Sequence, residues 1–78
     1  MSKYEKLLER IKNLDRGLTF EELSKVLERN GYVAYNNGSS HYTFRKPERE
    51  KVTLPRHIPM NIAYICLVRE TLEKEGVL

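Results

Sequence analysis

The sequence predicts a small α+β protein in which two helices, three antiparallel strands and a last helix follow one another. Apolar residues recur at helical spacing near both ends of the chain. Between these regions, residues 32–54 are rich in β-branched and aromatic side chains, as is typical of strands. Short turns divide this stretch, so we expect an antiparallel sheet with helices packed on one face, in the order α-α-β-β-β-α.

The first helix is predicted over residues 3–14, where the apolar side chains share one face. They are Tyr4, Leu7, Leu8, Ile11 and Leu14, with lysines and glutamates between them. The segment Asp15-Arg16-Gly17 should end this helix, with Gly17 in a left-handed cap.

Thr19 and Glu22 have the spacing of a capping box, which predicts that a second helix begins after Thr19. Its apolar side carries Phe20, Leu23, Val26 and Leu27. Asn30-Gly31 should close it.

Strands are expected at residues 32–36, 40–46 and 51–54, with Asn37-Gly38 as a two-residue hairpin turn between the first two. Strand side chains alternate between faces, so Tyr42 and Phe44 should face the helices, as should Val52 and Leu54. The opposite face would carry His41, Thr43, Arg45, Lys51 and Thr53. A polar, solvated sheet face is common, so this surface alone assigns no function.

After the loop Pro55-Arg-His-Ile-Pro59, residues 60–75 should form the last helix, followed by Gly76. This helix is apolar on more than one side. One stripe holds Ile62, Ile65, Cys66 and Leu72, and the back holds Ala63, Tyr64, Leu67 and Val68. We expect the back to pack against the first helix, since a helix apolar all round is normally buried. The alternative is an interface for a partner protein.

The composition limits the class of protein. The 78 residues suffice for one domain, and the net charge of +3 weakly favours anionic partners such as nucleic acid. One cysteine, a charged start and no apolar run long enough for a bilayer lead us to expect a cytoplasmic protein. Zinc-ligand spacing, a phosphate-binding loop and a dinucleotide fingerprint are absent from the sequence, so we expect no metal and no cofactor.

His41 is the candidate for chemistry. RNA cleavage without a metal needs a base for the ribose 2′-hydroxyl, an acid for the departing 5′-oxygen and cations for the phosphate charge. His41 could be the base, with Arg45 and Lys51 as cations and Ser39 and Ser40 as phosphate contacts. A second proton-transfer group is not evident in the sequence. His57 is a candidate, although it could instead hydrogen-bond its own turn, or bind phosphate with Arg56 beside the last helix.

Residues 38–47 (Gly-Ser-Ser-His-Tyr-Thr-Phe-Arg-Lys-Pro), residues 52–57 (Val-Thr-Leu-Pro-Arg-His) and a last helix ending in Glu-Gly resemble the HicA family of mRNA interferase toxins. The resemblance covers residues 19–76, so residues 1–17 would be an extra helix. It implies a double-stranded-RNA-binding-like fold, a single catalytic histidine at His41, and a HicB antitoxin that covers the site. The proline and histidine of the family's loop correspond to Pro55 and His57.

Two features depart from the family pattern. Ser40 is a second serine before His41, and Ile62 to Leu67 stand where the last helix commonly has Gly-Thr-Leu. These departures concern RNA contact and antitoxin pairing more than the role of His41.

Our leading hypothesis is a metal-independent endoribonuclease that cleaves mRNA, the toxin of a type II toxin–antitoxin system, with His41 as its catalytic residue. The expected RNA-binding residues are Ser39, Ser40, Thr43, Arg45, Lys46, Lys51, Arg56 and His57. The expected partners are mRNA and a HicB-like antitoxin, and a homodimer stays open. A non-catalytic RNA-binding module, and a protein-interaction domain that uses the first and last helices, are the alternatives.

Overall fold

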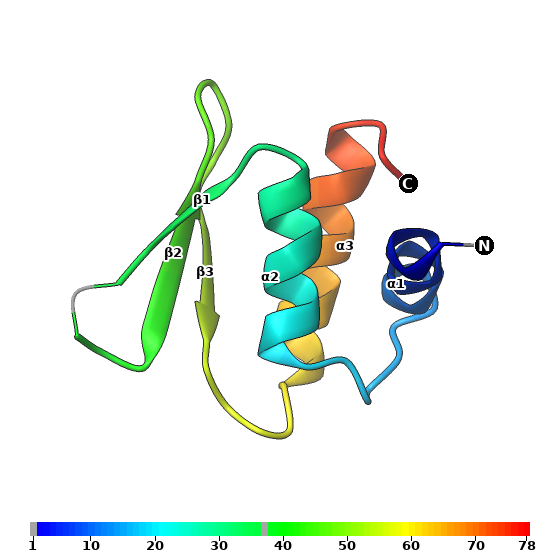
Figure 1. Ribbon diagram of the computed structural model, residues 1–78, viewed down its shortest axis with the longest axis horizontal. Coiled ribbons are helices and arrows are strands. Elements are labelled where there is room, and N and C mark those ends of the chain that lie inside the picture. Colours follow the sequence, from blue (N-terminus) through cyan, green and yellow to red (C-terminus); the bar gives the residue numbers. More distant parts are fainter. Residues whose placement is uncertain (1, 37) are drawn as a thin grey trace.

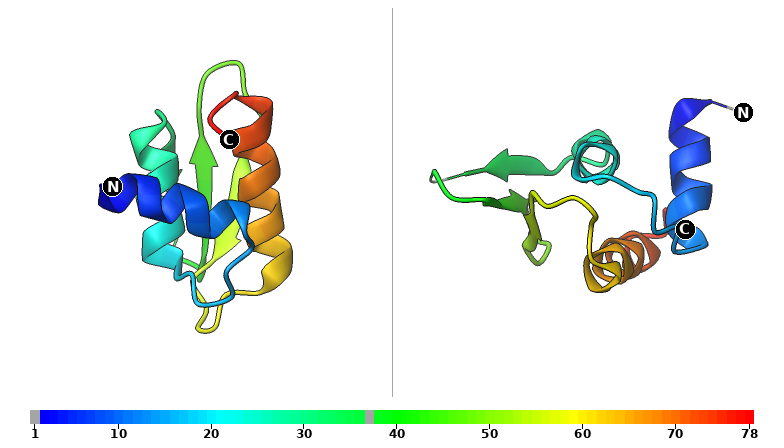
Figure 2. Two further views of the ribbon diagram at one scale, coloured as in Figure 1. Left: turned by 90° about the vertical axis from the view of Figure 1, so that its right-hand side faces the viewer. Right: turned by 90° about the horizontal axis from the view of Figure 1, so that it is seen from below.

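A computed structural model describes residues 2–36 and 38–78. Its elements are α1 (Lys3–Lys12), α2 (Phe20–Arg29), β1 (Val33–Tyr35), β2 (His41–Arg45), β3 (Val52–Pro55) and α3 (Ile62–Lys74). They form three layers: the sheet, then α2 and α3 side by side, then α1 across the outer side of those two helices (Figures 1 and 2). The predicted α+β order is confirmed, and one face of the three-stranded antiparallel sheet is open.

The strand register settles which side chains share a face. Tyr35 lies opposite Thr43, and His41 lies opposite Pro55. Phe44 is fully buried and Tyr42 is partly buried, and their rings lie 6.1 and 4.9 Å from the ring of Phe20 in α2. The prediction that Tyr42 and Phe44 face the helices is therefore confirmed.

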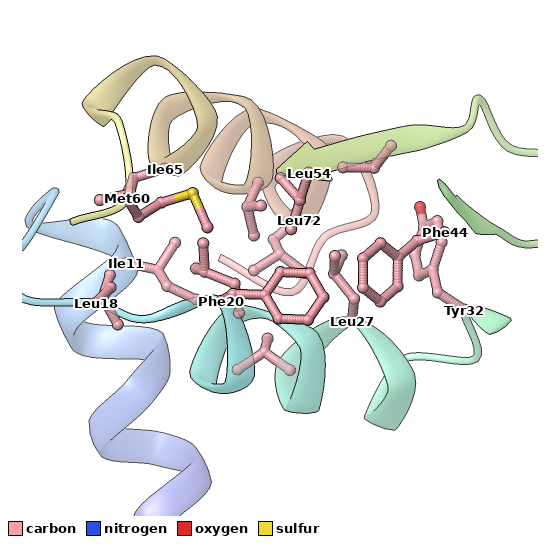
Figure 3. Packing of buried hydrophobic residues seen from close by; sticks show 14 residues of the cluster. Ile11, Leu18, Phe20, Leu27, Tyr32, Phe44, Leu54, Met60, Ile65 and Leu72 are labelled. Carbon is pink, nitrogen blue, oxygen red and sulfur yellow. The ribbon is translucent and has the colours of Figure 1, made fainter. Parts of the chain in front are cut away.

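The core extends from the inner face of the sheet, between α2 and α3, to α1 (Figure 3). It contains Ile11 from α1, Leu27 from α2, Leu54 from β3 and Leu72 from α3, none of which is exposed. Val68, on the predicted back of the last helix, is also buried, and α1 packs against both α2 and α3. The expected packing of the first helix on this side of α3 is thus confirmed only in part, because Tyr64 is partly buried but Ala63 and Leu67 are exposed.

The prediction that Gly17 forms a left-handed cap is wrong. α1 ends at Lys12, and Leu14 takes the left-handed conformation with φ of 53°. The N–H of Asp15 then bonds the Arg10 carbonyl at 3.0 Å, which completes a Schellman cap. Gly31, after α2, has a φ of 93° and confirms that Asn30-Gly31 closes that helix. The capping box of Thr19 and Glu22 is also confirmed.

β1 and β2 are shorter than predicted, because the connection between them is longer than a two-residue turn, and β3 keeps its predicted length but lies one residue later. β1 ends at Tyr35 and β2 begins at His41. Gly38 has a left-handed φ of 86°, as a turn residue should, and Asn37 lies outside the described residues. The last helix begins at Ile62, two residues later than predicted, since the Asn61 side chain accepts the Ala63 N–H as an N-cap. Across residues 2–36 and 38–78, the helices are all too short or too polar to span a bilayer.

Candidate active site on the open sheet face

His41 is exposed at the first position of β2. Beyond its pair with Pro55, one more backbone hydrogen bond extends the ladder: the Arg56 N–H donates to the Ser40 carbonyl at 2.7 Å. Because strand side chains alternate, this bond places His57 on the same face as His41 and directs Arg56 to the helix side.

The two imidazole rings meet on that face. Their centroids are 6.5 Å apart, with the rings nearly perpendicular at 81°. Both residues are exposed, so a ligand from solvent can reach both. The Ser40 hydroxyl lies 3.5 Å from Nδ1 of His41, which leaves Nε2 for another partner. The structure thus brings together three predicted site residues: Ser40, His41 and His57.

The segment before His41 is held by Asn36, a residue that the sequence analysis missed. Its side-chain amide donates to the carbonyls of Ser39 and His41 at 2.6 and 3.0 Å, and its oxygen accepts the Gly38 N–H at 2.8 Å. The Ser39 hydroxyl accepts the His41 N–H at 3.2 Å, so Ser39 orders the start of β2. An asparagine two residues before a glycine is typical of an Asx turn, and that signal could have identified Asn36.

Arg45 and Lys51 do not share a compact site with His41. Arg45 lies four residues further along β2, at roughly 13 Å for a rise of about 3.3 Å per residue. Lys51 stands at the same end of the sheet and lines a groove of about 250 Å³ with Tyr32 and Glu75. Both cations therefore lie at the opposite end of the sheet from His41, and the groove that Lys51 lines also contains residues of α3. Thr43, partly buried, lies between the two ends.

Two further predicted RNA-binding residues point to the helix side. The Lys46 Nζ pairs with Oε1 of Glu75 at 2.5 Å. The Arg56 Nη2 lies 3.3 Å from Oε1 of Glu21, and its guanidinium lies 5.8 Å from the Phe20 ring. The Tyr42 hydroxyl and then Glu21 raise the pKa of Arg56. Both cations thus have partners within the protein, away from the histidines.

Glu75 joins the sheet to the end of α3. It accepts hydrogen bonds from Lys46 and from the Tyr32 hydroxyl, and only 4% of its side chain is exposed. Burial raises the pKa of Glu75, but the bonds from Lys46 and Tyr32 outweigh it and bring the pKa below its usual value. Burial and the bond to Glu75 raise the pKa of Tyr32 to about 12. Lys46 is therefore a structural residue first.

The open face also carries two apolar side chains that the sequence analysis did not assign to it. Val33 and Tyr35 of β1 are 54% and 53% exposed, opposite Arg45 and Thr43. Their alternation with the partly buried Ala34 was the available signal. An exposed aromatic ring beside polar groups is a surface on which an unpaired base can stack.

Comparison with protein-family models, curated proteins and solved structures found no match to this chain. Among the residues that the structure describes, His, Cys, Asp and Glu side chains form no group of three or more that could hold a metal ion.

Proposed function

We propose that this chain is a metal-independent endoribonuclease that cleaves mRNA, with His41 as the general base. The observation that carries the proposal is the position of His41, exposed at the start of β2 on an open sheet face beside a second histidine. An exposed imidazole can take a proton from a ribose 2′-hydroxyl near neutral pH. Ser40 supplies a hydroxyl beside it.

The rest of the open face fits a single RNA strand. Tyr35 offers a ring to an unpaired base, and Arg45 lies where a neighbouring phosphate of the same strand would pass. Together with the motif around His41, these features support a HicA-like toxin with a double-stranded-RNA-binding-like fold, acting in the cytoplasm. A HicB-like antitoxin that covers this face would bury the exposed Val33 and Tyr35.

The test is cleavage of mixed-sequence RNA by the purified chain in EDTA. We expect products from the wild type, and a loss of roughly 10²- to 10⁴-fold for His41→Ala, since that is the usual contribution of a general base. Lys12→Ala, at an exposed position on α1, is the matched control and should cleave normally. Circular dichroism should show that both variants keep the fold.

The same experiment distinguishes the ribonuclease from the alternative, a non-catalytic RNA-binding module, which the exposed Tyr35 would also suit. That module would bind RNA in a salt-sensitive way without forming products, and His41→Ala would change little. Intact RNA at high wild-type concentration would refute the ribonuclease proposal. In cells, induced wild type should arrest growth and His41→Ala should be tolerated.

A further inference from the structure

We infer that His57 is the second proton-transfer group of this site, so that His41 and His57 act as base and acid on one phosphodiester. The inference rests on the proposed ribonuclease function and adds the group that protonates the leaving oxygen. With His41 alone, that oxygen would depart as an alkoxide or take its proton from water, which is the harder route.

The spacing of the rings suits this division of work. Their centroids are 6.5 Å apart, which is too far for a hydrogen bond between the rings. Two neighbouring rings at this spacing can each form a hydrogen bond of about 3 Å to a different oxygen of a single phosphodiester. The perpendicular arrangement, at 81°, keeps the rings from stacking, and both residues are exposed to solvent.

The backbone fixes this spacing. The hydrogen bond of 2.7 Å from the Arg56 N–H to the Ser40 carbonyl joins the two residues that immediately precede the histidines. The side chain of Arg56 is in turn paired with Glu21 at 3.3 Å. Pro55 restricts the backbone just before this bond, because its ring fixes φ. His57 is therefore placed by the sheet, although it lies in a loop.

The step balances with no further reactant. Neutral His41 takes the proton of the 2′-hydroxyl while the 2′-oxygen forms a bond to phosphorus. The bond from phosphorus to the 5′-oxygen breaks, and its electron pair stays on that oxygen, which takes a proton from protonated His57. The products are a 2′,3′-cyclic phosphate and a 5′-hydroxyl, and proton exchange with water restores both histidines. We assign the base to His41 because Ser40 can accept the proton of its Nδ1, which leaves Nε2 as the acceptor.

The test uses leaving groups of different basicity. The substrates are oligodeoxynucleotides with one ribonucleotide, made with each of the four bases, so that only one bond has a neighbouring 2′-hydroxyl. In a second set, sulfur replaces the bridging 5′-oxygen, and a thiolate can leave without a proton. kcat/KM is measured on both sets for wild type, His57→Ala, His57→Gln and His41→Ala, with thermal melts to establish folding.

We expect both His57 variants to lose roughly 10²- to 10⁴-fold on the oxygen substrates. On the sulfur substrates they should recover to within about tenfold of wild type, because general-acid catalysis is then not needed. His41→Ala should stay slow on both sets. If His57 had only a binding or folding role, its variants would lower kcat/KM equally on the oxygen and sulfur substrates, and that result would overturn the inference.

Two other outcomes are also decisive. Normal cleavage of the oxygen substrates by His57→Ala would refute the role of His57 as the acid, while the ribonuclease function would stand. If His41→Ala, and not His57→Ala, recovers activity on the sulfur substrates, the assigned roles of base and acid are overturned. If wild type cleaves neither set, the proposed function itself fails, and the two failures are thereby distinguished.

Discussion

Glu75→Gln should destabilise this protein more than its surface position at the end of α3 suggests. The carboxylate is 4% exposed and accepts hydrogen bonds from Lys46 and Tyr32. Glutamine keeps the shape of the side chain but removes its charge and replaces one oxygen acceptor with an NH2 group. That NH2 group must then face either the ammonium of Lys46 or the hydroxyl of Tyr32, both of which donate to Glu75. Hydrogen bonds to charged groups contribute about 1.5–3 kcal/mol each, and replacing one of two leads us to expect a loss of about 2–3 kcal/mol at pH 7.

This loss should be measurable by urea unfolding followed with circular dichroism. A loss of about 2 kcal/mol corresponds to a fall in Tm of roughly 8–16 °C for a domain of this size. Glu73→Gln is the matched control, because Glu73 is exposed on the same helix and pairs with Arg69 at 3.8 Å. An exposed pair of this kind should contribute no more than about 0.5 kcal/mol.

The destabilisation should also depend on pH. The pKa of Glu75 is lowered in the folded protein, so its contribution is present above the unfolded value of 4.5 and is lost as pH falls through the folded value. The difference between wild type and Glu75→Gln should therefore shrink from pH 7 toward pH 3. A difference below about 0.5 kcal/mol at pH 7, or one that is equal at both pH values, would refute this reasoning.

Four further outcomes are expected. Tyr32→Phe should cost about 1 kcal/mol up to pH 10, and the difference should vanish as pH rises through 12, because the pKa of Tyr32 is raised to about 12 in the folded state; equal unfolding curves at pH 8 would contradict this. Tyr35→Ala should weaken binding to oligouridylate by roughly tenfold in a fluorescence titration, and unchanged affinity would exclude stacking there. Arg45→Gln should lower the salt slope of that binding by about 0.7, and an unchanged slope would show that it meets no phosphate. Asn36→Asp keeps the acceptor for Gly38 but loses both donated bonds, so RNA cleavage should fall with little change in Tm; wild-type cleavage would show that the turn does not position His41.

Much of the fold could be predicted because its signals are local. The capping box of Thr19 and Glu22 involves residues three positions apart, and both side chains make the expected bonds. The alternation that turns Tyr42 and Phe44 toward the helices follows from strand geometry alone. The left-handed residue after α1 could not be predicted in this way, because Leu14 takes that conformation where a glycine was available three residues later.

The candidate site shows the same division. The sequence by itself determined that His41 lies in a strand and faces away from the helices, because periodicity and residue type decide both. Only the tertiary structure decided which cations are free, since Lys46 pairs with Glu75 from the far end of the chain and Arg56 pairs with Glu21 from α2. It also decided that His57 meets His41, because a backbone hydrogen bond between Arg56 and Ser40 joins segments 16 residues apart. Contacts of this kind depend on how strands and helices pack, and no pattern of neighbouring residues encodes them.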